Sequence, residues 1–319
     1  MRLRVLLEAR HGATYDQILA MAGTVEEVGF DAFFRSDHYL GIDPDDPVLA
    51  PTDSWTTLAG LARETRRVRL GTLVTAATFR LPGALAITVA TVDAMSGGRV
   101  ELGIGAAWYE REHRMFGIPF PPLRERFDRL EEQLQIIHGL WTTPPGQRFS
   151  FAGAHYRIEE CANFPRSAQS PHPTLIVGGS GPRRTPTLAA RFADEFNVGY
   201  HVGLAERFAS FRRICAEVGR DPATVRLSTC LPVCCGRDQA EVRRRIEAIG
   251  QPRLTAQAVA GGPEAVLERL AELAVTGVDT VYFHIFDVND LDHIRLLGRE
   301  VLPRAAGLTP STAAAAGRP

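Results

Sequence analysis

The stretch Ala32-Phe33-Phe34-Arg35-Ser36-Asp37-His38-Tyr39 is the most informative part of this sequence about its fold. Its first residues are apolar and predict a short buried strand, and a carboxylate and an imidazole follow at once. In a barrel of alternating strands and helices, the strand ends share one face, where the catalytic groups lie. Asp37 and His38 therefore predict a functional site if the rest of the chain alternates in the same way. The alternative is a solvated pair of turn residues.

The rest of the chain does alternate between strand-like and helix-like segments. Short apolar runs predict eight strands, at Leu3 to Glu8, Asp31 to Arg35, Val68 to Val74, Val100 to Ile104, Thr174 to Val177, Glu195 to Val198, Val225 to Cys234 and Thr280 to Ile285. Helical spacing of apolar residues predicts helices between them, at Tyr15 to Val28, Thr52 to Thr65, Pro82 to Met95, Leu123 to Trp141, Thr185 to Ala193 and Ala205 to Val218, with helical material up to Ala274 and a last helix up to Val301. This order predicts a (β/α)8 TIM barrel, with a doubly wound open sheet as the alternative.

Residues 143–173 interrupt this alternation. Pro144-Pro145-Gly146 is followed by alternating apolar residues on both sides of Ala152-Gly153, which is a hairpin signal. The segment lies between the fourth helix and the fifth strand, so it predicts a β-hairpin insertion. We expect a single domain over residues 1–303 and a disordered tail over residues 304–319, which are rich in Ala, Thr, Pro and Gly.

The composition excludes several classes of function. A net charge of -1 over 319 residues gives no general basis for binding nucleic acid or membrane surfaces. No apolar run is long enough to span a bilayer, and the N-terminus resembles a strand more than a signal peptide. The five cysteines have no framework spacing and favour a reducing cytoplasm. Cys230, Cys234 and Cys235 lack the matched partners of a metal site, so we expect a cytoplasmic, metal-free protein that acts on a small molecule.

Chemically capable side chains gather after the predicted strands, where a barrel would bring them to one face. Four of the nine histidines are among them, although strand ends at a surface favour polar residues in any case. The set is Glu8, His11, Asp37, His38, Thr75, Thr78, Trp108, Tyr109, Glu110, Gly178 to Gly181, Tyr200, His201, Cys234, Cys235, His284 and Asp287.

The segment Gly178-Gly179-Ser180-Gly181-Pro182-Arg183-Arg184 follows the fifth strand and opens a helix. Glycines let backbone N–H groups approach a ligand, and the N-terminus of the helix is positive. Arg183 or Arg184 can add charge. The segment therefore predicts a phosphate cradle, and the alternative is a tight strand–helix turn that binds nothing.

Four motifs together resemble the luciferase-like monooxygenase superfamily, and within it the branch that uses coenzyme F420, a deazaflavin. They are Arg35 to Tyr39, Leu70 to Thr75 followed by Thr78-Phe79-Arg80, Ser96 to Glu110, and Val177 to Gly181. The resemblance implies a (β/α)8 barrel with an insertion and a flavin-type ring in the barrel mouth. It implies a bulge with a non-prolyl cis peptide bond at Leu73-Val74 that supports the ring. It also implies a homodimer that forms through the second and third helices.

The resemblance also implies roles for individual residues. His38 is the expected catalytic acid or base, because imidazole transfers protons near neutral pH. The cofactor-binding residues implied are Asp37, Leu73, Val74, Thr75, Ala107, Gly178, Gly179, Ser180, Gly181 and Arg183. The substrate-binding residues implied are His11, Trp108, Tyr109, Glu110 and His201. For Trp108 and Tyr109 the alternative is packing of a loop against the hairpin.

Two positions depart from the sugar-phosphate dehydrogenases of this family. Trp108 stands where they carry a catalytic glutamate, and Ile42 stands where they carry a tryptophan. Both departures argue against a sugar-phosphate substrate, and Glu110 or Glu112 is a candidate for the missing acid.

The sequence thus predicts an F420-dependent oxidoreductase that transfers a hydride between C5 of the deazaflavin and a C=C, C=N or C=O bond, in either direction. One alternative is an FMN-dependent monooxygenase supplied by a partner reductase. Another is a flavin- or F420-binding protein without catalytic activity.

Overall fold

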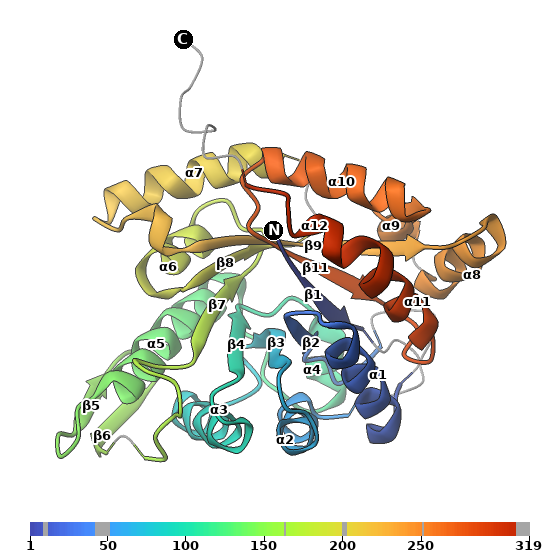
Figure 1. The fold of residues 1–319 in the computed structure, drawn as a ribbon. Coiled ribbons are helices and arrows are strands. Elements are labelled where there is room, and N and C mark those ends of the chain that lie inside the picture. The colour runs from blue at the N-terminus through green and yellow to red at the C-terminus, as the bar shows by residue number, and fades with distance from the viewer. Residues whose placement is uncertain (9–11, 42–51, 163, 200–202, 251, 311–319) are drawn as a thin grey trace, which may run out of the picture.

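Eight parallel strands close into a barrel in the computed structural model, which describes residues 1–8, 12–41, 52–162, 164–199, 203–250 and 252–310 (Figure 1). In barrel order they are β1 (Arg2–Leu7), β2 (Ala32–Arg35), β3 (Arg69–Ala76), β4 (Val100–Gly105), β7 (Thr174–Gly178), β8 (Glu195–Val198), β9 (Arg226–Cys235) and β11 (Thr280–Ile285). Pairing of β8 with β9, and of β11 with β1, closes the ring. The predicted (β/α)8 TIM barrel is confirmed, and the open-sheet alternative is wrong because the sheet has no free edge at these strands.

Helices cover the outside of the barrel, and the main ones are α1 (Tyr15–Val28), α2 (Ser54–Glu64), α3 (Pro82–Ser96), α5 (Leu123–Thr142), α6 (Arg184–Phe192), α7 (Leu204–Glu217), α10 (Pro263–Val275) and α11 (Leu291–Leu296). Local sequence sets their ends. In α1, the Thr14 hydroxyl accepts a hydrogen bond from the Gln17 amide, the Gln17 side chain accepts one from the Thr14 amide, and Gly29 ends the helix with a φ of 92°. No helix among the described residues is both long and apolar enough to cross a membrane.

The predicted hairpin insertion is confirmed as the antiparallel pair β5 (Phe149–Ala152) and β6 (Arg157–Cys161). The pair extends alongside α5, at the outer end of that helix (Figure 1). The Glu132 carboxylate of α5 accepts hydrogen bonds from the backbone amides of Ala154, His155 and Tyr156, which attaches the turn to the helix. The insertion therefore packs on the outside of the barrel and leaves the mouth to other loops.

Three features of the chain differ from the sequence-based expectation. A short helix, α4 (Glu110–Met115), follows β4 where a loop was expected. The helical material before Ala274 contains α8 (Gln239–Ile249), α9 (Pro252–Thr255) and a short strand, β10 (Val259–Gly261), which pairs with the end of β9. The folded chain also continues past residue 303, through a π-helical turn at Leu297–Val301 and α12 (Leu302–Ala305), so the first residues of the expected tail are part of the fold.

The reason for this last difference is packing that the composition does not reveal. Ala305 is fully buried, and Leu308 packs on the core while its carbonyl accepts a hydrogen bond of 2.6 Å from the amino group of Met1. Residues 311–319 of the expected tail lie outside the described residues.

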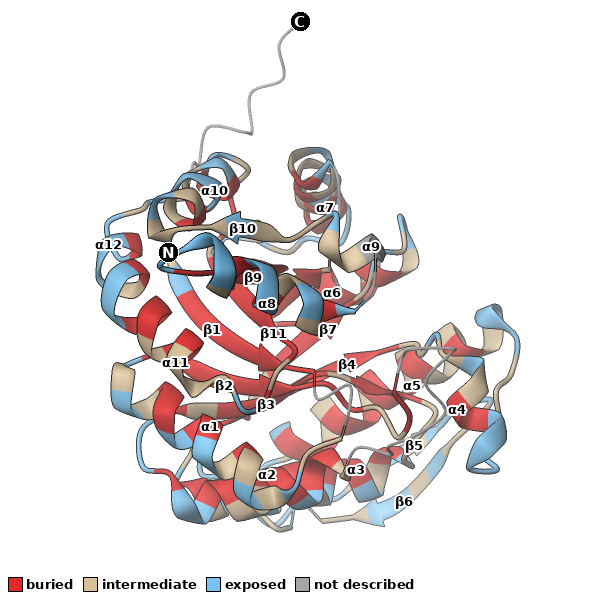
Figure 2. Cartoon of the chain, turned by 90° about the vertical axis from the view of Figure 1, so that its right-hand side faces the viewer, coloured by how far each residue is buried: buried red, intermediate tan, exposed pale blue. Residues whose placement is uncertain are grey.

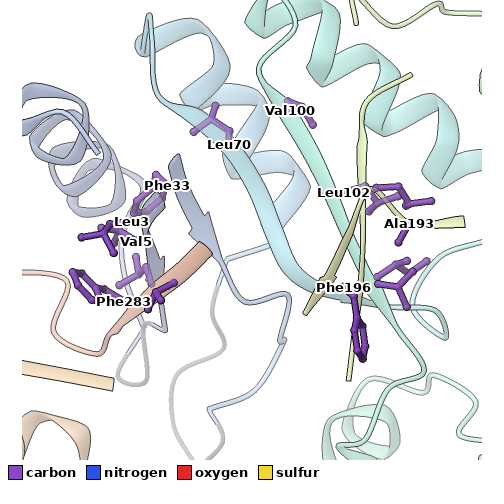
Figure 3. Close-up of a cluster of buried hydrophobic side chains, with 14 of the residues drawn as sticks. Leu3, Val5, Phe33, Leu70, Val100, Leu102, Ala193, Phe196 and Phe283 are labelled. Carbon is purple, nitrogen blue, oxygen red and sulfur yellow. The ribbon is translucent and has the colours of Figure 1, made fainter. Parts of the chain in front are cut away.

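Side chains of each strand alternate between the two faces of the barrel wall. Residues that point outward, such as Leu3, Phe33 and Phe196, pack under the helices in one large core (Figure 3). A smaller apolar cluster fills the inside of the barrel, with Leu6 and Phe34 among its members. The strands are accordingly buried along their length, while the outer faces of the helices are exposed (Figure 2).

A network of buried charges closes the amino-terminal end of the barrel. Arg4 of β1 donates hydrogen bonds of 2.7 and 3.1 Å to Glu101 and of 2.9 Å to the Tyr282 hydroxyl. That hydroxyl donates a hydrogen bond of 2.7 Å to Glu195. Because this end is filled, the carboxyl-terminal end is where a ligand can enter.

Candidate active site

Asp37 lies directly after β2 and is held in a fixed position by its neighbours. The Thr75 hydroxyl of β3 donates a hydrogen bond of 2.8 Å to Oδ2, and Arg80 Nη1 donates one of 2.6 Å to the same oxygen. Trp55 Nε1 in turn donates to the Thr75 hydroxyl at 3.1 Å. Asp37 is only 1% exposed, so the solvated-turn alternative is wrong for this residue. Its carboxylate joins the ends of two strands.

Arg80 extends this arrangement to the start of α2. Its Nη2 donates a hydrogen bond of 2.5 Å to Asp53, whose other oxygen accepts one of 2.8 Å from the Thr56 amide as the cap of α2. Burial acts to raise the pKa of Asp53, but the hydrogen bond from Thr56 and the charge of Arg80 outweigh it and lower that pKa. Arg80 therefore bridges two carboxylates and is not available as a cation for a ligand.

His38 forms a close pair with Glu112, which lies on α4. His38 Nδ1 is 3.0 Å from Glu112 Oε1, and the Tyr39 amide donates a hydrogen bond of 3.1 Å to Oε2. Since a carboxylate accepts only, Nδ1 carries the proton of this bond and Nε2 remains for a ligand. Burial acts to lower the pKa of His38, but the hydrogen bond and charge of Glu112, with Glu8 and Asp37, outweigh it and raise that pKa.

Of the two glutamates suggested as replacement acids, the structure brings Glu112 to His38 and leaves Glu110 exposed at the start of α4. Glu112 is 1% exposed. Sequence reasoning named it only as one of two candidates, because α4 is too short to show a helical period. The helix itself is held by His113, whose Nδ1 lies 2.7 Å from the Tyr109 carbonyl and whose Nε2 lies 2.7 Å from the Thr78 hydroxyl.

Trp108 and Tyr109 stand beside His38. Their rings are stacked, with centroids 5.1 Å apart, and His38 lies edge-on to Trp108 at 5.7 Å and to Tyr109 at 6.2 Å. Ala107, just before them, has a left-handed φ of 65°. The rings of Trp108 and Tyr109 thus lie beside His38 and belong to the same candidate site. The structure brings together His38, Trp108 and Tyr109 as expected for one side of a pocket.

Val74 forms a partly exposed floor that is surrounded by glycines. The predicted cis peptide bond Leu73–Val74 is present, and the register of β3 against β4 shifts between Thr72 and Thr75. An added Cβ at Gly178 would lie 2.7 Å from a Val74 methyl carbon, and one at Gly105 would lie 3.0 Å from the other methyl carbon. These positions therefore require glycine, because the Val74 methyl groups occupy the space that a side chain there would need.

The predicted phosphate cradle lies between β7 and α6. Gly179 has a φ of 150° and donates to the Asn197 carbonyl at 3.1 Å, which turns the chain, and Ser180 is exposed at the tip. Arg184 donates a hydrogen bond of 2.6 Å to Asp128, whereas the guanidinium of Arg183 is exposed and makes no hydrogen bond or ion pair with the described residues. Arg183 is thus the available cation of the two.

Other predicted residues are placed as follows. His11 and His201, with Ile42 and Tyr200, lie outside the described residues. His284 is buried inside the barrel mouth, 3.9 Å from Glu8, and burial lowers its pKa to about 3. Burial also raises the pKa of Cys234 to about 12 and of Cys235 to about 11, which disfavours reactive thiolates there.

Within the described part of the chain, no three His, Cys, Asp or Glu side chains are grouped as metal ligands. A cavity of about 670 Å³ lies between β9 and α10 on the outside of the barrel, and it contains none of the residues predicted for the site.

Comparison with known proteins places the chain in a family. A family model described as luciferase-like monooxygenase matches residues 1–253. An F420-dependent glucose-6-phosphate dehydrogenase of Nakamurella multipartita is 38% identical over 181 residues, or 56% of this chain and 51% of that one, so the match spans about half of the relative's length. An F420-dependent hydroxymycolic acid dehydrogenase of Mycobacterium tuberculosis is 32% identical over 260 residues, or 81% of this chain and 68% of that one.

Among solved structures, the monooxygenase RslO1 from Streptomyces bottropensis superposes with a TM-score of 0.79 over 95% of this chain and 99% of that one. Its sequence identity of 22% supports the shared fold alone. The matching family model covers most of the barrel and all the motifs that build the site. This chain therefore belongs to the luciferase-like monooxygenase family.

Proposed function

We propose that this protein is an oxidoreductase that uses coenzyme F420 and acts on a small organic substrate. When bound, F420 supplies hydride transfer at C5 of its deazaflavin ring, to or from a C=C, C=N or C=O bond. Two relatives named as F420-dependent dehydrogenases support the choice of cofactor. The observation that carries the proposal is the partly exposed Val74 at the strand ends, packed against Gly105 and Gly178, together with His38, which is paired with Glu112 after β2.

The residues proposed to hold the cofactor fit a flat ring that carries a phosphate. Leu73, Val74 and Thr75 would lie under the ring. The anchored Asp37 and the turn at Ala107 would border it. The phosphate would be held by the backbone of Gly178 to Gly181 at the N-terminus of α6, with the guanidinium of Arg183 beside it.

His38 is proposed to hold and move the proton of the reaction at Nε2. Reduction of a double bond needs a proton in addition to the hydride, and an imidazole is suited to donate it near neutral pH. The hydrogen bond from Nδ1 to Glu112 fixes the orientation of the ring and favours its protonated form. Glu112 therefore acts as a positioning residue for His38.

Trp108 and Tyr109 are proposed to form the wall of the substrate pocket. Glu110, at the exposed start of α4, would lie at its entrance. His11 and His201 remain proposed substrate contacts on the basis of the sequence alone.

Titration of the protein with F420, FMN and their reduced forms tests the cofactor. We expect F420 to bind more tightly than FMN, and reduced F420 to be oxidised only when a substrate accepts the hydride. Consumption of O2 with reduced FMN would overturn the proposal in favour of the monooxygenase alternative. Tight binding of F420 without hydride exchange on any substrate would favour the alternative of a binding protein without activity.

A homodimer through α2 and α3 is proposed as well. The outward face of α3 carries small and apolar residues, with Ile87 50% exposed and Leu81, just before the helix, 69% exposed. An apolar helix face is usually covered by another surface. Light scattering tests this, because Ile87→Asp should convert a dimer to a monomer, and a monomeric parent protein would contradict the proposal.

The remaining proposals concern location and domain structure. A cytoplasmic location is supported by the five cysteines, none of which forms a disulfide bond. We also propose that the chain forms one domain, which extends past the expected boundary at residue 303 to include Ala305 and Leu308, with residues 143–173 as its insertion.

A further inference from the structure

The exposed ring of Trp108 is a preformed apolar surface beside His38. Trp108 is 59% exposed, whereas the other two tryptophans, Trp55 and Trp141, are 2% and 5% exposed. Its ring is supported from behind by the stacked ring of Tyr109, whose hydroxyl donates a hydrogen bond of 3.1 Å to the Gly41 carbonyl. A large aromatic side chain held in the open next to a reactive nitrogen is suited to bind a flat or apolar group.

The backbone before Trp108 fixes the direction in which the ring points. Ala107 has a φ of 65°, and its carbonyl accepts a hydrogen bond from Arg126. The Arg126 guanidinium also lies 4.0 Å from the centre of the Phe120 ring, so its own position is set. Because the wall is held in place before a ligand arrives, little conformational entropy is lost when one binds.

The charges that act on His38 do not favour an anion. Within the described part of the chain they come from Glu112, Glu8 and Asp37, all carboxylates. Three arginines near these strand ends are bonded within the protein, Arg35 to Thr52 and Thr57, Arg80 to Asp37 and Asp53, and Arg126 to a carbonyl.

The sequence offers few other cations for this site. The chain contains no lysine, and its undescribed segments between residues 9 and 202 contain one arginine, Arg10, against the three aspartates Asp43, Asp45 and Asp46. A phosphate ester carries up to about two negative charges at neutral pH, and proteins bind such groups with arginine, lysine or backbone amides. The cradle at Gly178 to Gly181 is already assigned to the cofactor in the proposed function.

We infer that the substrate is an uncharged molecule with a flat aromatic or conjugated group next to the reacting bond, bound against Trp108, and that it is not a sugar phosphate. This inference rests on the proposed F420-dependent function for the identity of the reaction. To that function it adds the chemical class of the substrate, and it identifies Trp108 as the residue that selects this class.

Calorimetric titration with two probes tests this inference on the intact protein, with and without F420. Benzylideneacetone is an uncharged, flat enone, and glucose 6-phosphate is the charged alternative. We expect benzylideneacetone to bind and glucose 6-phosphate to give no binding signal. Trp108→Ala should weaken enone binding about tenfold or more, and Trp108→Phe, which keeps a flat ring, by less than about threefold.

Val275→Ala is the matched control, because Val275 is 70% exposed on α10 and far from His38 in sequence and in the fold. It should bind benzylideneacetone as tightly as the parent protein. Melting temperatures of the Trp108 variants should be close to that of the parent, since the ring is exposed.

Binding of glucose 6-phosphate at least as tight as that of benzylideneacetone would overturn the inference, as would unchanged enone binding by Trp108→Ala. Failure of the proposed function gives a different result. Enone binding that depends on Trp108 in a protein that does not bind F420 would contradict the cofactor while the substrate class stands.

Discussion

The two ends of the barrel interior both contain buried charges, but these charges have different partners. At the amino-terminal end, Arg4 is bonded to Glu101 and to the Tyr282 hydroxyl, and that hydroxyl is bonded to Glu195. At the carboxyl-terminal end, His38 is bonded to Glu112 through Nδ1, and Nε2 is the nitrogen proposed to act on the substrate. Burial of charge is therefore not in itself a sign of function, because it serves packing at one end and orients the proposed catalytic imidazole at the other.

The two ends also differ in the size of the side chains that fill them. Large side chains occupy the amino-terminal end, and Tyr282 and Arg4 are among the largest fully buried residues. Glycines 103, 105 and 178 lie on the strands at the carboxyl-terminal end, where an added side chain would meet Val74, which is itself partly exposed. The amino-terminal end of the barrel is thus filled by large side chains, whereas the carboxyl-terminal end carries small residues around a partly exposed valine.

The largest expected effect is a loss of turnover when the proposed proton donor, the imidazole of His38, is removed. His38→Ala should lower kcat with reduced F420 by about 10²–10⁴-fold, because general acid–base groups contribute that much. Affinity for F420, measured by fluorescence titration, should stay within about tenfold, since binding and proton transfer are separate roles. His155→Ala, on the hairpin, is the control and should leave kcat unchanged. Normal turnover by His38→Ala would remove this residue from the mechanism.

A substitution at the amino-terminal end of the barrel should lower the free energy of unfolding instead of turnover. Arg4→Met leaves Glu101 and Glu195 buried without the cation between them, and removal of one partner of a buried pair costs about 3–5 kcal/mol. Urea unfolding should show this loss, while F420 affinity of the folded protein is retained. Arg304→Met breaks the exposed pair with Glu264 and should leave the urea midpoint nearly unchanged, because solvent screens this pair. Equal costs for the two variants would contradict the proposed difference between buried and exposed pairs.

The packing around Val74 is tested by adding one methyl group at position 178. Gly178→Ala places a Cβ 2.7 Å from a Val74 methyl carbon, and relief of such a contact costs about 1–3 kcal/mol. Because Val74 must move, F420 affinity should fall by roughly tenfold or more. Gly23→Ala on α1 meets nothing within 4 Å and should leave affinity unchanged. Unaltered F420 affinity in Gly178→Ala would place the ring elsewhere.

The smallest effect concerns pH. Glu112→Gln removes the charge that raises the pKa of His38, so the basic limb of the kcat profile for reduction should move to lower pH. A His with a raised pKa in the folded state adds stability that is present below its unfolded pKa and is lost as pH rises through the folded pKa. Thermal unfolding of Glu112→Gln should therefore differ from the parent more at acidic than at basic pH. An unchanged pH profile would rule out Glu112 as the positioning residue.

Much of the barrel could be predicted from local sequence. The strands Glu195–Val198 and Thr280–Ile285 and the helix Tyr15–Val28 have the predicted bounds, because each combines a clear apolar period with a distinct end. The helix α4 and the strand β10 were not predicted, since six and three residues are too few to show a period. The missed α4 is also why Glu112 was not singled out.

The sequence by itself determined the alternation of strands and helices, the hairpin insertion and the placement of Asp37 and His38 at a strand end, because these depend on residues close together in the chain. Only the tertiary structure decided which distant groups meet. It paired His38 with Glu112, 74 residues away, and Asp37 with Arg80, 43 residues away. Closure of the barrel brings these strand ends together, and no local pattern specifies which side chain of the next loop reaches which nitrogen.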